Sequence, residues 1–77
     1  MRIEQDYPAL ARELGLTRGQ REHIAASGLV KTTARPGSRT RISDEDAELL
    51  RRASALAIAA GIAVIIALRV LTAGGST

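Results

Sequence analysis

Residues 9–30, with the sequence ALARELGLTRGQREHIAASGLV, contain two short helical stretches separated by a glycine. Asp6 can cap the first stretch, and Gly15 supplies the left-handed residue that commonly ends a helix. Thr17 is a favourable N-cap for the second stretch, which Gly28 ends in the same way. The two predicted helices are therefore joined by about three residues, which is the length and glycine content of a helix-turn-helix corner.

The second predicted helix carries polar side chains that suit contact with a nucleic acid. In a helix-turn-helix this helix enters the major groove, where arginine binds guanine and glutamine binds adenine. We expect its DNA contacts to come from Thr17, Arg18, Gly19, Gln20, Arg21 and His23, above all from the two arginines. Plainer interpretations exist for three of them: Gly19 as a tolerated imperfection, Gln20 as a contact to the first helix, and His23 as an ordinary surface residue.

An alternation of period two begins at Val30 and predicts a β-hairpin. One face would carry Val30, Thr32, Thr40 and Ile42, and the other Lys31, Thr33, Arg39 and Arg41. Between the strands, Pro36 and Gly37 suit positions i+1 and i+2 of a type II turn. As a wing, this hairpin would neutralise phosphates or enter the minor groove through Lys31, Arg35, Arg39 and Arg41, although a solvated basic face also occurs without a ligand.

The run SDED at residues 43–46 predicts the start of a third helix. Ser43 is a suitable N-cap, and the acidic first turn complements the helix dipole. Two apolar faces of this helix compete for the core: Ala47, Leu50, Ala53 and Ala57, or Leu49, Leu56 and Ala60.

The composition excludes several classes of protein. The 77 residues include no cysteine, which rules out disulfides and zinc ribbons, and one histidine with dispersed carboxylates provides no metal site. No nucleophile–base pair or phosphate loop is recognisable, so we expect no catalytic residue, no cofactor and no enzymatic activity. The first ten residues lack the apolar core of a secretory signal. A monomer this short buries only about 60% of its unfolded surface, which favours a partner subunit or a bilayer.

The net charge of +3 belongs to the first half of the chain. Residues 1–42 contain eight basic and four acidic side chains, whereas residues 43–77 contain three and four. Within residues 18–41, Glu22 is the single acid among six basic side chains. This distribution indicates a polyanionic partner.

Residues 53–68 carry Ser54 as their only polar side chain and allow two interpretations. A membrane span needs about 20 apolar residues, a length that residues 53–71 approach if Arg69 reaches the membrane surface. Alternatively, Gly61 ends the third helix, and a fourth helix over residues 62–71 is buried between this chain and a second copy. The dimer contacts would then come from Leu56, Ile58, Ile62, Ile65, Ile66 and Leu68.

The order of these elements resembles the DNA-binding domain of MerR-family regulators. LARELGLT at residues 10–17 resembles the first helix and corner of that domain, and GLV at residues 28–30 resembles its GLL. RISDEDAELL at residues 41–50 resembles the run that leads into the next helix of the family. The resemblance covers residues 7–50 and implies a winged helix-turn-helix that binds double-stranded DNA.

Two departures limit what the resemblance implies. The family's Thr-hydrophobe-Arg-aromatic-aromatic run is replaced by Gln20-Arg21-Glu22-His23-Ile24, so its arginine contact does not transfer to Glu22. The family's long coiled coil and effector domain do not follow, so ligand or metal sensing is not implied. The chain is more similar to the minimal members, which include small excisionase-like and phage regulatory proteins.

The sequence as a whole predicts a mainly α protein: a winged helix-turn-helix with a short hairpin wing and an apolar C-terminal helical segment for dimerisation. Residues 1–50 would form the DNA-binding part, and residues 51–77 the dimerisation segment with a short tail. We expect a cytoplasmic, nucleoid-associated homodimer, or a cooperative array, that binds double-stranded DNA as a transcriptional regulator or an architectural factor. There are two alternatives. The first is a single-pass membrane protein with a basic cytoplasmic head. The second is a protein-interaction module whose basic hairpin binds an acidic partner.

Overall fold

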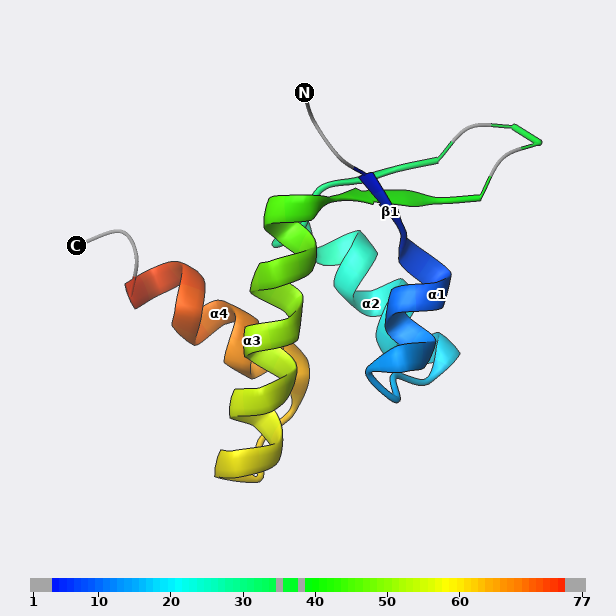
Figure 1. Ribbon diagram of the computed structural model, residues 1–77. Helices are drawn as coiled ribbons and strands as arrows, with labels where there is room; N and C mark the ends of the chain where they lie inside the picture. The colour runs from blue at the N-terminus through cyan, green and yellow to red at the C-terminus, as the bar shows by residue number, and fades with distance from the viewer. Residues whose placement is uncertain (1–3, 35, 38, 75–77) are drawn as a thin grey trace.

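The computed structural model describes residues 4–34, 36–37 and 39–74, which form four helices and one small sheet (Figure 1). In chain order the elements are β1 (Glu4–Asp6), α1 (Tyr7–Glu13), α2 (Arg18–Ser27), β2 (Thr32–Thr33), β3 (Arg41–Ser43), α3 (Asp44–Ala60) and α4 (Val64–Gly74). The expectation of a mainly helical chain with a small β element is confirmed.

The helix ends follow from local capping, as the sequence predicts. Asp6, Thr17 and Ser43 each accept a hydrogen bond at the side chain from the backbone amide three residues later. Such caps satisfy amides that have no partner inside the helix. At the other ends, Gly28 (φ 77°) and Gly61 (φ 67°) adopt the left-handed conformation that stops a helix.

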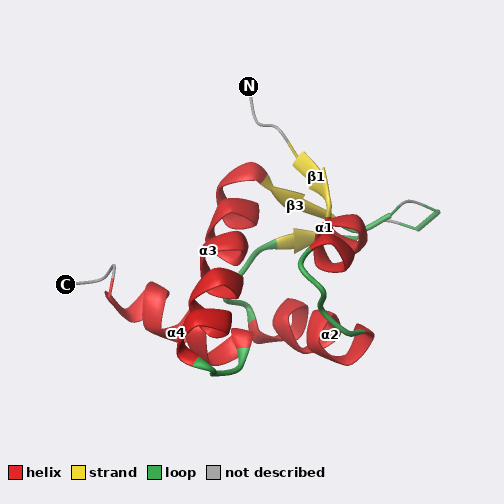
Figure 2. Cartoon of the chain, turned by 60° about the horizontal axis from the view of Figure 1, so that its bottom comes forward, coloured by secondary structure: helices red, strands yellow, loops and turns green. Residues whose placement is uncertain are grey.

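The sheet is antiparallel and has the order β1-β3-β2 (Figure 2). In its register, Ile42 of the central strand lies between Gln5 of β1 and Thr32 of β2. The pairing of β2 with β3 is the predicted hairpin. The third strand, β1, was not predicted from the sequence, and it ties the start of the chain to α3 through the Gln5 amide, which donates to Asp44 Oδ1 at 2.6 Å.

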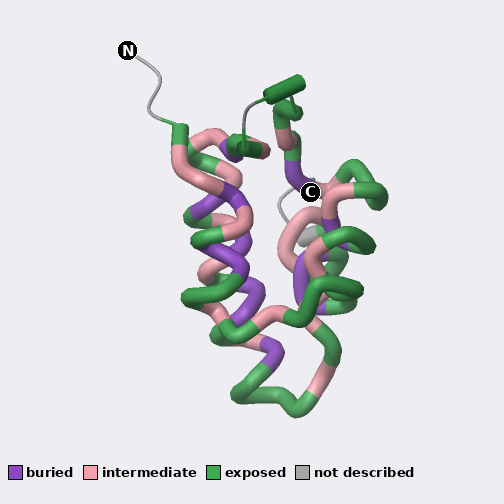
Figure 3. Tube along the Cα trace, turned by 90° about the vertical axis from the view of Figure 1, so that its right-hand side faces the viewer, coloured by how far each residue is buried: buried purple, intermediate pink, exposed green. Residues whose placement is uncertain are grey.

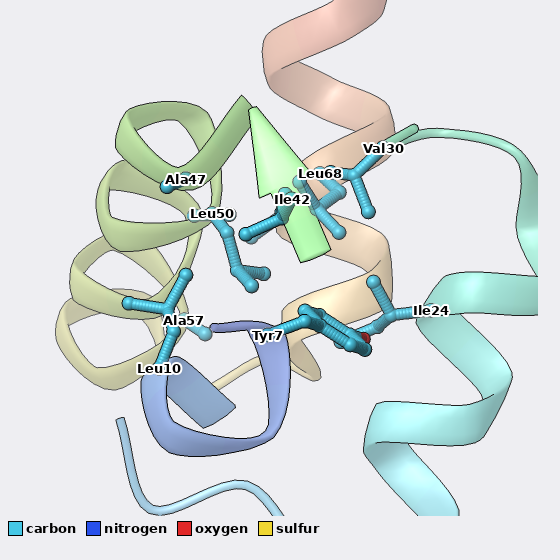
Figure 4. Packing of buried hydrophobic residues seen from close by; sticks show 11 residues of the cluster. Tyr7, Leu10, Ile24, Val30, Ile42, Ala47, Leu50, Ala57 and Leu68 are labelled. Atoms are coloured by element: carbon cyan, nitrogen blue, oxygen red, sulfur yellow. The ribbon is translucent and has the colours of Figure 1, made fainter. Parts of the chain in front are cut away.

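The core lies between the helices, with the sheet at one end, and the buried positions are on the inner sides of the helices (Figure 3). Leu50 of α3, Ile42 of β3 and Leu68 of α4 are each at most 1% exposed and converge with Tyr7 of α1 (Figure 4). Of the two alternative faces of α3, the first is the buried one: Ala47, Leu50, Ala53 and Ala57. Alanine at three of these positions lets α4 pack closely against α3.

A break at residues 61–63 separates the two apolar helices, and α4 turns back beside α3 (Figure 1). The single helix predicted over residues 53–71 in the membrane interpretation is therefore not formed, because Gly61 ends α3. The predicted fourth helix is present but runs from Val64 to Gly74. Within the described residues no single helix is long and apolar enough to cross a membrane; α3 and α4 meet that requirement only as a pair bent by 115°.

Tyr7, the only aromatic residue of the chain, joins α1 to α2. Its side chain is 2% exposed, and its hydroxyl donates to the backbone carbonyl of Arg21 at 2.6 Å. Burial raises the pKa of the phenol above its ordinary value of 10.0, and the nearby charge of Arg21 opposes part of that rise. The neutral hydroxyl is therefore the form that the folded chain stabilises.

Replacing Tyr7 with phenylalanine should lower the free energy of unfolding by about 0.5–1.5 kcal/mol, because the hydrogen bond to Arg21 is lost. A folded pKa above the unfolded one adds stability that is complete below the unfolded pKa and disappears as the pH rises through the folded pKa. The wild-type chain should thus lose this contribution in alkali, whereas the variant has none to lose. Urea unfolding followed by circular dichroism, from neutral pH upward, measures both effects. Parallel pH profiles for the two proteins would contradict this role of the phenol.

Candidate nucleic-acid interface

The corner between α1 and α2 fixes which face of α2 is turned outward. Residues 14–17 connect the two helices, and the Leu16 amide donates to the Ala11 carbonyl at 2.9 Å. Ile24 is 1% exposed and anchors α2 to the core. The opposite side of the helix is open to solvent and consists of Arg18, Gly19, Glu22, His23 and Ala26.

Two of the predicted DNA contacts, Thr17 and Gln20, stabilise the first turn of this helix. The Thr17 amide donates to Oε1 of Gln20 at 2.9 Å, and the Gln20 amide donates to Oγ1 of Thr17 at 3.2 Å. This reciprocal capping box satisfies two amides that the helix leaves unpaired. The amide oxygen of Gln20 thus already accepts one hydrogen bond, and its second lone pair would have to serve any contact with adenine.

The remaining predicted residues of α2 differ in exposure. Arg18 is exposed and its Nε lies 3.1 Å from Oε1 of Glu22, one helical turn away. Arg21 is half-buried at the side of α2, where its backbone carbonyl receives the Tyr7 hydroxyl. His23 is exposed and lines a shallow hollow together with Arg69 of α4. Arg69 was not among the predicted contacts, because only the return of α4 toward α2 brings it to this surface.

The hairpin has the alternation that the sequence predicts. Val30 and Ile42 are buried, whereas the exposed positions are Lys31, Thr33, Arg39 and Arg41. The described part of the connection between β2 and β3 extends away from the helices (Figures 1 and 2). Gly37 has a φ of 77°, as position i+2 of the predicted type II turn requires. Arg35, the predicted contact near the tip, lies outside the described residues.

Two carboxylates from neighbouring elements contact the hairpin. Oδ2 of Asp46 accepts a hydrogen bond from the Lys31 amide at 3.0 Å. Oδ2 of Asp6 pairs with Nε of Arg39, while Oδ1 of the same carboxylate caps α1. Arg39, which the sequence predicts as a free phosphate contact, is thus already paired. Over the described part of the chain, the side chains of Lys31 and Arg41 have no acidic partner within 4.0 Å.

No family model, curated protein or solved structure matches this chain. What the surface can bind therefore follows from its own side chains. They are guanidinium, ammonium and imidazole groups around an exposed helix and a hairpin, a set that suits an extended anion. In the ranges that the structure describes, no three acidic or histidine side chains are placed to hold a metal ion.

Large apolar side chains are also exposed on α3 and on α4. Ile58 is 81% exposed, Ile66 47% and Val70 53%. Of the other predicted dimer contacts, Leu56, Ile62 and Ile65 are half-buried against the core. Leu68 lies instead in the core of the chain itself, with 0% exposure, because α4 turns this side chain toward α3. Val70, one turn after Ile66, was not predicted and belongs to the exposed surface.

Proposed function

We propose that this chain is a small dimeric winged helix-turn-helix protein that binds specific sequences in double-stranded DNA. Its role would be that of a transcriptional regulator or an excisionase-like architectural factor, acting with the DNA in the cytoplasm. The observation that carries the proposal is the exposed basic face of the hairpin, where Lys31 and Arg41 lack acidic partners in the described structure. Beside this hairpin, α2 has an open outer face and is joined to α1 by a short corner. A recognition helix and a wing are the two elements with which a winged helix-turn-helix contacts DNA.

In this arrangement α2 enters the major groove with its open face, and the hairpin lies along the neighbouring backbone. Arg18 and His23 on the helix face the base edges or the flanking phosphates. Lys31 and Arg41 neutralise phosphates, which positions the protein without selecting a sequence. Arg39 joins them only by exchanging Asp6 for a phosphate, since its guanidinium is already paired.

Self-association is part of the proposal, and the occupant of the apolar surface is a second copy of this chain. Ile66 and Val70 form an exposed apolar stripe on α4, flanked by Arg69. One small module reads few base pairs, and two copies bind half-sites about 34–36 Å apart, which raises both affinity and specificity. A core of this size also gains stability from an added apolar interface.

Sedimentation of the detergent-free protein, alone and with a mixed-sequence duplex, tests the proposal. We expect a dimer that co-sediments with the duplex at low salt. Replacing Ile66 with aspartate should shift the free protein to monomer, because a charge in an apolar interface loses its hydration. Ala9→Asp, at an exposed position of α1, is the matched control and should leave the dimer intact. A protein that does not bind the duplex, or that stays dispersed only in detergent, would refute the proposal and favour the membrane-anchored alternative.

A further inference from the structure

Glu22 occupies the middle of the open face of α2. It precedes the buried Ile24 by two residues, which places it about 160° around the helix from the core-facing side. Its side chain is 63% exposed. Gly19, one turn earlier, leaves open space beside it, since a β-carbon there would meet no atom within 4 Å apart from its chain neighbours. On the side of Gly19, a base edge can therefore approach the carboxylate.

The charge of Glu22 is unfavourable for general attraction to DNA. It is the single acid in the basic segment of residues 18–41, and it lies on the face that would meet a polyanion. The fold gains little from it, because an exposed ion pair four residues apart in a helix adds only slightly to stability. A role in recognition would offset this repulsion.

The pair that Glu22 forms with Arg18 leaves hydrogen-bonding groups on both partners. Nε of Arg18 donates to Oε1 of Glu22 at 3.1 Å. Within the described structure, neither the two Nη groups of Arg18 nor Oε2 of Glu22 has a hydrogen-bond partner. A carboxylate only accepts hydrogen bonds, and the major groove offers it the amino group of cytosine. The guanidinium of Arg18 offers paired donors to N7 and O6 of guanine.

We propose that Glu22 is a specificity-determining residue, whose carboxylate accepts a hydrogen bond from the N4 amino group of a cytosine. Through its other oxygen, the same carboxylate holds the guanidinium of Arg18 toward an adjacent guanine. The two side chains together then recognise a cytosine next to a guanine. This inference rests on the proposed binding of double-stranded DNA. It adds the identity of the bases that one turn of α2 selects.

Selection from a pool of duplexes with a randomised centre, followed by sequencing of the retained molecules, tests the inference. The wild-type chain should enrich a cytosine–guanine step. In Glu22→Gln the cytosine should be replaced by adenine, because glutamine pairs with N6 and N7 of adenine, while the guanine remains. Total binding to unselected duplex should rise several-fold in this variant, since a repulsive charge is removed. Glu48→Gln is the control: it alters a glutamate of equal exposure that pairs with Arg52 on α3.

The outcomes separate this inference from the proposed function. If the wild-type chain retains no duplex, the proposed function itself fails, and the role of Glu22 fails with it. If duplex is retained but Glu22→Gln enriches the same bases as the wild type, only the role of Glu22 is overturned. A purely structural role would lower the stability of the variant slightly and would leave the enriched bases unchanged.

Discussion

Replacing Leu50 with alanine should lower the free energy of unfolding by about 2–5 kcal/mol. The side chain is 0% exposed and extends from α3 into the centre of the cluster shown in Figure 4. Truncation removes apolar contacts with the sheet and with α4 and leaves a cavity that short, capped helices cannot close without losing other contacts. A 77-residue chain has only about 4–12 kcal/mol of stability in total, so a large share is lost.

Chemical denaturation followed by circular dichroism measures this loss, with Arg52→Ala as the control on the same helix. Arg52 is exposed, and its nearest acidic partner, Glu48, lies 4.0 Å away. Its replacement should change the unfolding free energy by no more than about 0.5 kcal/mol. Equal effects of the two substitutions would mean that Leu50 is not at the centre of the core.

The affinity for duplex DNA should fall by about 10²–10³-fold between roughly 50 and 200 mM salt. Phosphate contacts release condensed counterions, so the logarithm of the binding constant falls linearly with the logarithm of salt concentration, by about 0.9 for each contact. About four to six contacts from both elements of the interface give the stated range. Fluorescence anisotropy of a labelled duplex, titrated at several salt concentrations, measures the slope.

Arg41→Ala should reduce that slope by about one, and should weaken binding similarly for all sequences, because a phosphate contact carries no base information. Arg41 is the informative position, since its guanidinium has no acidic partner in the part of the chain that the structure covers. Arg52→Ala again serves as the control and should leave the slope unchanged. Affinity that is independent of salt would contradict an interface built on the hairpin.

The helix ends were predictable because capping acts within a few residues. Thr17, Ser43, Gly28 and Gly61 each specify a helix end through their own side chain or backbone freedom, and all four do so in the structure. The alternation around Val30 likewise predicted which residues of the hairpin are exposed. At Gly61 the sequence allowed either one long helix or two shorter ones, and the structure has two, since Gly61 adopts the left-handed conformation.

Interactions between distant segments were not predictable in this way. The strand β1 has the sequence Glu-Gln-Asp, which lacks apolar alternation, and it forms only because β3 offers a free edge. The pairing of Arg39 with Asp6 requires that this strand first bring the carboxylate beside the hairpin. The position of Arg69 near His23 depends in the same way on the reversal of the chain at residues 61–63.

That reversal also has a thermodynamic consequence. Because α4 returns to contact α2, the helix that would associate with a second copy touches the helix that would meet DNA. If α4 shifts when two copies associate, its contacts with α2 change. If α2 shifts when it binds a duplex, the surface of α4 that faces a second copy changes. Such coupling is reciprocal: if dimer formation strengthens DNA binding by some factor, DNA strengthens dimer formation by the same factor. Binding sites in tandem would then fill in pairs, even where the protein is too dilute to pair in free solution.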